Sequence, residues 1–233
     1  MKVIFVMSGK GGVGKTTVSV NLAYSLEGKV GLMDADIHGP NVPNMLGIKE
    51  EIRMREDMML PVEHDGLKVM SIGFMLKKND SVAWRGPMKH NLISQFIQKT
   101  EWGELDYLVV DLPPGTGDEA LSAIQLLKNY ENGAVIVSTP QKVSIQDTLR
   151  CIDFCKQTGI NITGIIENMS GGLFGQDTLT EVANSTGNDF LGKLSLDENI
   201  VKAGEQGVSF TGDNGQLDVE FQRIVKKVKN NLG

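Results

Sequence analysis

Residues 9–17 have the sequence Gly9-Lys10-Gly11-Gly12-Val13-Gly14-Lys15-Thr16-Thr17, and this stretch decides the fold. It satisfies the pattern G-x-x-x-x-G-K-[ST] at every fixed position. The run Val3–Met7 before it is short and continuously apolar, as expected of a strand that is buried on both faces. After it, Val18, Leu22 and Leu26 recur at helical spacing, which predicts a helix. Strand, glycine-rich loop and helix in this order predict a cradle for phosphate groups.

Each residue type in this loop has a physical reason. Glycines allow the backbone N–H groups to turn inward and allow phosphate oxygens to approach closely. The N-terminus of the following helix adds partial positive charge. We expect Lys15 to reach the β- and γ-phosphates of a nucleoside triphosphate, and the Thr16 hydroxyl to bind Mg²⁺. The expected nucleotide-binding residues of the loop are Gly9, Lys10, Gly11, Gly12, Val13, Gly14, Lys15, Thr16 and Thr17.

Lys10 is an additional feature, because a phosphate-binding loop needs only one lysine. Two ammonium groups so close together would repel each other unless both contact anionic oxygen. The alternative is a solvated loop lysine. The stretch K-G-G-V-G-K-T-T resembles the deviant Walker A motif of the MinD/ParA/Mrp class of P-loop ATPases. In that class the first lysine reaches the partner subunit's nucleotide, so the resemblance implies that two subunits sandwich ATP.

The composition limits the class of protein. The chain has 233 residues, and we expect a single P-loop domain over 1–233. Its formal net charge of −6 argues against nucleic-acid binding through bulk positive charge. Apolar runs are too short for a membrane span, and the chain enters a strand without a signal peptide, so we expect a cytoplasmic protein. The two cysteines, Cys151 and Cys155, are too few for a disulfide framework.

Apolar runs alternate with helical patterns along most of the chain. Further strands are expected at 29–33, 67–72, 107–111, 134–138 and 162–166. Helices are expected around Leu92–Ile97 and over 144–157, and residues 52–65 form a methionine-rich excursion that is consistent with a small hairpin. The alternation predicts an α/β fold with a doubly wound, mainly parallel sheet and helices on both faces. Ligands of such sheets bind beyond the carboxyl ends of the strands, where the polar motifs of this chain lie.

Asp111 closes an apolar strand, at the position of a Walker B carboxylate. It is expected to hold Mg²⁺ directly or through water, and a strand-end cap is the alternative. In the loop 112–118 that follows, the N–H of Gly115 is a candidate contact to the γ-phosphate, which would let the loop distinguish ATP from ADP. Asp118 either belongs to this loop or caps the next helix.

Two more carboxylates follow the strand 29–33. Asp36 is our candidate for aligning the attacking water, because phosphoryl transfer needs positioning and charge stabilisation more than a strong base. Asp34 either points to the opposite face of the strand or supports the metal shell. Lys10, Lys15 and Asp36 are therefore the candidate catalytic residues, and Thr16, Asp36 and Asp111 are the candidate metal ligands.

Asn168 lies in Glu167–Met169, which we expect to follow the strand 162–166. Its side chain has the paired donor and acceptor needed to recognise the edge of adenine. A turn-forming asparagine before Ser170 is the alternative. The position favours the adenine role.

Several further motifs are found in one family. They are D-A-D-I-H-G-P-N at 34–41, W-R-G-P-M at 84–88, D-Y-L-V-V-D-L-P-P-G-T-G-D-E at 106–119, S-T-P-Q at 138–141 and E-N-M-S at 167–170. Over nearly its whole length the chain resembles the Mrp/ApbC family. The resemblance implies a homodimeric ATPase that carries or assembles iron–sulfur clusters, with assembly proteins or apo-protein clients as partners. It also implies that Asp36 belongs to the first switch and Asp111 to the second.

The chain departs from this family at one functional point. The family carries a C-x-x-C pair shortly after E-N-M-S, and a dimer then presents four thiolates to a bridging cluster. Residues 171–177 contain no cysteine here. Clusters require soft ligands, so the residues of this chain do not support cluster binding. Cys151 and Cys155 share one helix face, and we interpret them as core residues.

Three functions stay open at this point. The first is iron–sulfur cluster assembly or transfer with cysteines from another protein, and the second is a metal-free, ATP-switched adaptor or regulator. The third is a membrane-associated positioning ATPase of the MinD type, because residues 217–232 combine an apolar stripe with a basic face. For that segment we favour a final helix that packs on the domain, since surface helices commonly have this pattern.

Overall fold

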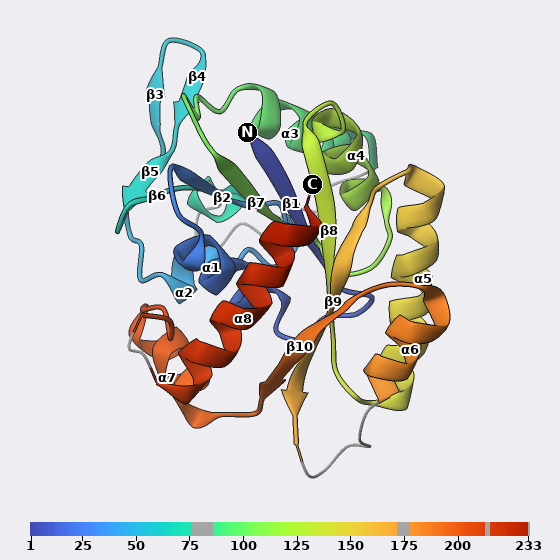
Figure 1. The fold of residues 1–233 in the computed structure, drawn as a ribbon. Coiled ribbons are helices and arrows are strands. Elements are labelled where there is room, and N and C mark those ends of the chain that lie inside the picture. The colour runs from blue at the N-terminus through green and yellow to red at the C-terminus, as the bar shows by residue number, and fades with distance from the viewer. Residues whose placement is uncertain (76–85, 172–177, 213–214, 233) are drawn as a thin grey trace.

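The computed structural model describes residues 1–75, 86–171, 178–212 and 215–232. Within this part of the chain, eight strands form one sheet in the order β10-β9-β8-β1-β7-β2-β6-β5. All neighbouring strands are parallel except β5 and β6, which pair antiparallel at one edge. The expected doubly wound, mainly parallel sheet is confirmed, and helices cover both of its faces (Figure 1).

The strands of the sheet are β1 (Lys2–Met7), β2 (Val30–Asp34), β5 (Val62–His64), β6 (Leu67–Ser71), β7 (Tyr107–Asp111), β8 (Glu131–Ser138), β9 (Ile162–Ser170) and β10 (Phe190–Ser195). A separate hairpin joins β3 (Arg53–Arg55) to β4 (Met58–Leu60). The helices are α1 (Lys15–Ser25), α2 (Val42–Met45), η1 (Ile72–Phe74), α3 (Gly86–Gln98), α4 (Asp118–Leu127), α5 (Lys142–Thr158), α6 (Thr178–Thr186), α7 (Glu198–Gln206) and α8 (Gln216–Asn231).

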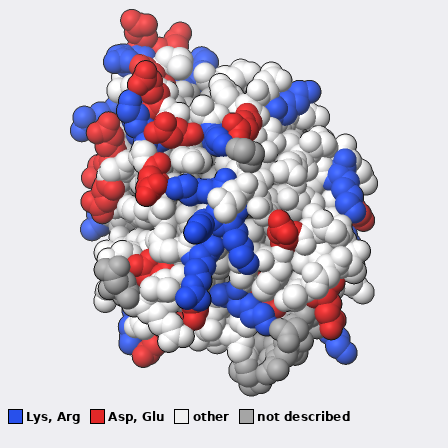
Figure 2. All heavy atoms as spheres, in the orientation of Figure 1, with Lys and Arg blue, Asp and Glu red and all other residues white. Residues whose placement is uncertain are grey.

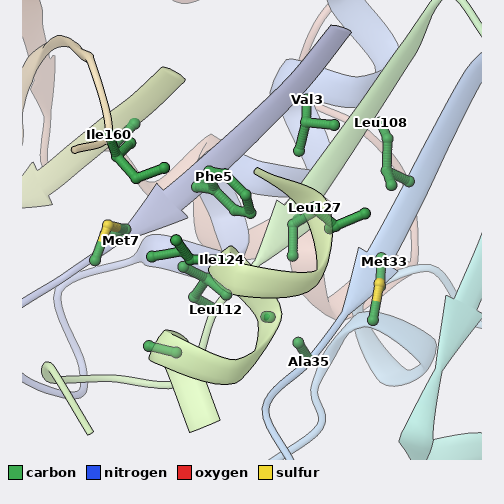
Figure 3. Close-up of a cluster of buried hydrophobic side chains, with 14 of the residues drawn as sticks. Val3, Phe5, Met7, Met33, Ala35, Leu108, Leu112, Ile124, Leu127 and Ile160 are labelled. Carbon is green, nitrogen blue, oxygen red and sulfur yellow. The ribbon is translucent and has the colours of Figure 1, made fainter. Parts of the chain in front are cut away.

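The alternation of side chains along β1 divides the core into two layers. Val3, Phe5 and Met7 join the cluster under α3, α4, α5 and α6, part of which is drawn in Figure 3. Ile4 and Val6 point to the other face and join the cluster under α1, α2, α7 and α8. All five side chains are almost fully buried, because a strand in the centre of a parallel sheet is covered on both sides.

The order of the strands brings three loops together. β1 is flanked by β7 and β8, and β7 lies between β1 and β2. The direction in which successive strands are added reverses around β1. Because β1, β2 and β7 are parallel, the loops that follow them all leave from the carboxyl ends of the strands. Such a reversal opens a crevice at the carboxyl ends of the strands. The glycine-rich loop, Asp34 and Asp111 are placed at this crevice by the topology alone.

The C-terminal helix α8 packs on the sheet. Its apolar residues Phe221, Ile224, Val225 and Val228 are at most 3% exposed. Our interpretation of this segment as a packed final helix is confirmed, and its apolar stripe is not available for insertion into a membrane. Arg223, Lys226 and Lys227 of α8 are exposed. Lys and Arg side chains gather on the face of the molecule that carries α8 (Figure 2). Among the described residues, no helix is long and apolar enough to cross a bilayer.

Several boundaries differ from those expected from the sequence. β9 continues to Ser170, so Glu167, Asn168 and Met169 belong to the strand, and the expectation that they follow it was wrong. The polar side chains of Glu167 and Asn168 concealed the strand, because the local signal of a buried strand is an apolar run. The stretch 52–65 forms the β3–β4 hairpin and also the edge strand β5. Residues Trp84 and Arg85 of the W-R-G-P-M motif lie outside the described residues.

Candidate functional site

The glycine-rich loop leads from β1 into α1. Gly12 and Gly14 have φ values of 78° and 83°, in the left-handed region that glycine adopts without strain. Gly14 is the N-cap of α1 and has no side chain that could accept a hydrogen bond from the first amides of the helix. The first turn of α1 contains no acidic residue. The amides at this helix terminus are therefore available to an external anion.

Beside this terminus, the Asp111 carboxylate accepts hydrogen bonds from three side chains of α1. Lys15 Nζ lies 2.7 Å from Asp111 Oδ1, and Thr16 Oγ1 lies 2.8 Å from Oδ2. Ser19 Oγ lies 2.7 Å from Oδ1. Asp111 and Ser19 are fully buried, and Lys15 is 7% exposed. The arrangement brings together the predicted residues Lys15, Thr16 and Asp111, and it adds Ser19, which no sequence motif indicated.

A hollow of about 430 Å³ opens in front of this cluster. Its walls come from the glycine-rich loop, the start of α1, the loop after β2, α2, the loop after β7 and α7. The lining residues are Ser8, Gly11, Gly12, Gly14, Lys15, Thr16, Thr17, Asp36, Gly39, Asn41, Asn44, Met45, Pro114 and Gly204. Most of the loop residues expected to bind phosphate therefore line one hollow, and Asp36 lines it as well.

The two carboxylates after β2 make different contacts. Asp36 Oδ1 accepts hydrogen bonds from the backbone N–H groups of His38 and Gly39, each at 3.1 Å, and its residue is half-buried at the hollow. Asp34 is fully buried and accepts hydrogen bonds from Ser71 Oγ at 2.9 Å and Val42 N at 3.1 Å. Burial, together with the neighbouring charge of Asp111, raises the pKa of Asp34 to about 7. Asp34 thus ties β2 to β6 and α2, which fits a structural role for this member of the pair.

Gly115 contacts Ser8, directly before the glycine-rich loop, and Asn168 contacts the loop itself. The N–H of Gly115 donates a hydrogen bond to the carbonyl oxygen of Ser8 at 2.7 Å, and Gly115 has a φ of 88°. Asn168 is 5% exposed, and its Nδ2 donates to the carbonyl oxygen of Val13 at 2.8 Å. A phosphate contact from Gly115 would therefore require its N–H to leave Ser8, and Asn168 braces the loop from β9.

A second hollow, of about 280 Å³, adjoins the first through Thr17, Met45 and Gly204. Asn168 lines it together with apolar side chains from α7 and from the segment between β10 and α7. These apolar residues are Leu196, Ile200 and Val201, and Leu196 is 64% exposed. Polar residues, among them Ser195, Asp197 and Glu205, complete the lining. Apolar surface beside a side-chain amide suits a flat heterocycle.

Lys10 and Gly9 both lie against the N-terminal part of α5. Lys10 Nζ donates to Gln141 Oε1 at 2.9 Å, and Gln141 is the N-cap residue of α5. A Cβ placed on Gly9 would lie 2.5 Å from the backbone carbonyl atoms of Asp147, so only glycine allows this approach. The loop and α5 are therefore in direct contact.

Asp118 is the first residue of α4, and the N-cap position belongs to Gly117. The alternative in which Asp118 caps the helix was therefore wrong. Asp118 lies inside the first turn, where a carboxylate interacts favourably with the helix dipole.

The two cysteines are core residues, as interpreted from the sequence. Both are fully buried on α5, and Cys155 Sγ lies 3.7 Å from Met7 Sδ. Burial raises the pKa of each thiol to about 12. Residues 172–177, at the position where the family's C-x-x-C pair would lie, are outside the described residues. Within the described ranges, no group of three or more His, Cys, Asp or Glu residues is arranged to hold a metal ion.

Comparison with known proteins identifies close relatives. The family model described as ParA, NUBPL iron-transfer P-loop NTPase, matches residues 1–231. The chain is 43% identical over 241 residues to the iron–sulfur cluster carrier protein of Methanocaldococcus jannaschii, covering 97% of this chain and 83% of the relative. It is also 43% identical over 227 residues to the human cytosolic Fe–S cluster assembly factor NUBP2, covering 89% of this chain and 84% of that protein.

Solved structures agree with the fold. A nucleotide-binding protein from Archaeoglobus fulgidus in complex with ADP superimposes with a TM-score of 0.79 at 36% identity, covering 94% of this chain and 90% of that one. The cell division ATPase MinD of Pyrococcus furiosus superimposes with a TM-score of 0.73 at 21% identity, covering 98% of each chain, and this likeness supports the fold alone.

The contact between the glycine-rich loop and α5 predicts unequal effects of two substitutions in the loop. Gly9→Ala should lower the free energy of unfolding by about 1–3 kcal/mol, because the methyl group overpacks against the Asp147 backbone. Gly11→Ala is the matched control, since a Cβ there meets no atom within 4 Å. Urea unfolding without nucleotide measures both. Equal stability of the two variants would contradict this packing.

The buried thiols predict slow modification of the native protein. At pH 8 only about one part in 10⁴ of each thiol is ionised at a pKa of about 12, and the side chains are covered. Ellman's reagent should label neither Cys151 nor Cys155 within minutes, and should label both after unfolding in guanidinium chloride. Rapid labelling of the native chain would show that the cysteines are accessible after all.

Proposed function

We propose a function for this chain, which belongs to the ParA family, described as NUBPL iron-transfer P-loop NTPase. It binds Mg²⁺·ATP at the N-terminus of α1, hydrolyses ATP slowly, and uses this cycle in the assembly or transfer of iron–sulfur clusters. The observation that carries the proposal is the Asp111 carboxylate, held by Lys15 and Thr16 beside a hollow of about 430 Å³. The P-loop NTPase family and the ADP complex of the Archaeoglobus fulgidus relative support nucleotide binding.

The binding step exchanges one partner of Lys15 for another. The Lys15 ammonium is within ion-pair distance of Asp111 and also lines the hollow, so a triphosphate there competes with Asp111 for it. The amides of Gly12, Val13 and Gly14 and the dipole of α1 supply the remaining positive potential. Lys15 is almost fully buried, and it has an anionic partner in either arrangement, Asp111 or a phosphate oxygen. Neither arrangement therefore leaves an uncompensated charge in the interior.

The oxygen atoms of Thr16 and Asp111 fit a magnesium site. They are 2.8 Å apart, both are hard donors, and Mg²⁺ in nucleotide sites takes only one or two carboxylates in addition to phosphate oxygens and water. When bound, Mg²⁺ neutralises part of the charge on the β- and γ-phosphates. The role of the chain's own residues is to hold these oxygens beside the hollow, which Thr16 lines.

Asp36 aligns the attacking water in this proposal. Its carboxylate is fixed by the two backbone N–H groups of His38 and Gly39, and it lines the same hollow as Lys15. A fixed carboxylate that accepts a hydrogen bond from water supplies positioning, which is the main requirement of phosphoryl transfer. Gly115 would report the γ-phosphate by moving its N–H from the Ser8 carbonyl oxygen to the ligand.

Lys10 acts on the nucleotide of a second subunit in a homodimer. Its ammonium is held by a neutral amide oxygen of Gln141, a weaker partner than a phosphate oxygen, so release from Gln141 is easily compensated. Asn168 and the apolar hollow of about 280 Å³ would receive the adenine ring. The names of the relatives as cytosolic assembly factors support a cytoplasmic location.

The iron–sulfur cluster is the cargo, and the thiols of this chain do not fit it. Cys151 and Cys155 are buried within the core, with pKa values raised to about 12, whereas cluster ligands are thiolates. We therefore assign the cluster ligands to a partner protein. The same observation favours a second candidate function, a metal-free adaptor or regulator that is switched by ATP.

Lys10→Ala should retain ATP binding and lower the rate of hydrolysis by about 10³-fold, because a charge that stabilises the transition state from the partner subunit is lost. Lys142→Ala, an exposed lysine at the start of α5, is the control and should keep the wild-type rate. Phosphate release and binding calorimetry measure the two quantities separately. Undiminished turnover in Lys10→Ala would refute the role of Lys10.

Anaerobic reconstitution separates the two candidate functions. With Fe²⁺ and sulfide, the chain alone should bind no stable cluster, as measured by absorbance near 400 nm and by iron counting. With an apo-ferredoxin and a glutathione-bound cluster present, Mg²⁺·ATP should change the rate of cluster transfer, and Lys10→Ala should abolish this change. A stoichiometric cluster on the chain alone would refute partner-supplied ligands. Transfer that is independent of ATP would favour the adaptor.

A further inference from the structure

Ser19 is a fully buried polar residue of α1 that lies outside the glycine-rich motif. It follows Lys15 by one helical turn, so both side chains are on the face of α1 that packs against β7. Its Oγ lies 2.7 Å from Asp111 Oδ1 and 3.0 Å from the carbonyl oxygen of Lys15. A buried helical serine commonly donates to the carbonyl oxygen four residues earlier. The shorter distance and the charged acceptor identify Asp111 as the stronger partner here.

The three donors around Asp111 differ in what they can reach. Lys15 and Thr16 line the hollow of about 430 Å³, and each has a proposed partner there. Ser19 does not line this hollow, so it has no access to a ligand. When a nucleotide draws Lys15 and Thr16 away, Ser19 is the side-chain donor that stays on Oδ1 among the described contacts of Asp111.

The Asp111 carboxylate requires a hydrogen-bond donor that stays in place when a nucleotide binds. It is fully buried, and its strand neighbour Asp34 places a second buried carboxyl group beside it. A buried carboxylate oxygen that has no donor is unfavourable in itself. A hydroxyl fixed to Oδ1 offsets this cost and leaves Oδ2 directed toward Thr16.

We propose that Ser19 is a positioning residue, which holds the Asp111 carboxylate oriented for Mg²⁺ after Lys15 and Thr16 have turned to the nucleotide. This inference rests on the proposed binding of Mg²⁺·ATP at this site. Ser19 touches neither the nucleotide nor the metal, and its effect is exerted through Asp111 alone.

The test compares nucleotide affinity with and without Mg²⁺. Calorimetry with a non-hydrolysable ATP analogue is carried out in EDTA and over a series of Mg²⁺ concentrations. Ser19→Ala should bind the analogue in EDTA within about twofold of the wild type, whereas the Mg²⁺ concentration for half-maximal enhancement should rise about tenfold, because one donor to a buried carboxylate is missing. Ser19→Thr keeps the hydroxyl and should restore most of the Mg²⁺ response.

Ser122→Ala is the matched control. Ser122 is also a buried helical serine that donates to the carbonyl oxygen four residues earlier, but within the described part of the chain its hydroxyl contacts His90 and no carboxylate. It should keep the wild-type Mg²⁺ response. If Ser19→Ala does not fold, Ser19→Cys is measured in its place, since a thiol is a weaker donor of similar size.

An unchanged Mg²⁺ response in Ser19→Ala overturns the inference. An equal loss of affinity in EDTA and in Mg²⁺, with a lowered melting temperature, also overturns it, because that result describes a structural serine. Failure of the wild type to bind the analogue in Mg²⁺ would instead overturn the proposed function, so the two failures are distinguishable.

Discussion

The buried carboxylate of Asp111 is the constraint on which the site depends. A charged group at the end of a central strand is tolerated in the interior only when donors surround it, and α1 supplies three of them within 2.8 Å. These hydrogen bonds fix α1 against β7 and hold its N-terminus beside the hollow. The same charge balance that stabilises the fold thus keeps Lys15 and Thr16 at the place where a nucleotide would need them.

Much of the fold followed from local patterns in the sequence. The glycine-rich loop predicted the first strand and helix, and apolar runs predicted the parallel sheet, because central strands are buried on both faces. β9 was predicted too short, since Glu167 and Asn168 are buried polar residues within a strand, and their burial depends on tertiary contacts. The antiparallel edge strand β5 and the helices α6 and α7, which are three to nine residues long, were not predicted.

The candidate site could be predicted only in part, because some of its residues belong to sequence motifs and others are brought in by tertiary contacts. Lys15, Thr16 and Asp111 belong to recognisable motifs, and the topology brings them together. Ser19 belongs to no motif, and only its position one turn after Lys15 placed it on the same face. The contacts of Lys10 with Gln141 and of Asn168 with Val13 join segments more than a hundred residues apart, so no local pattern contains them. The lack of cluster ligands could be predicted from the sequence. The chain has two cysteines, which share one helix face, and the structure shows that both are buried, so they do not form an exposed pair of soft ligands.

The central claim is that Lys15 exchanges Asp111 for phosphate when Mg²⁺·ATP binds. A crystal structure with Mg²⁺ and a non-hydrolysable ATP analogue measures this most directly. We predict that Lys15 Nζ lies within hydrogen-bond distance of a phosphate oxygen and beyond ion-pair distance from Asp111, with Ser19 still bonded to Oδ1. A nucleotide bound elsewhere, or a Lys15–Asp111 ion pair that persists at 2.7 Å beside the bound triphosphate, would contradict the account.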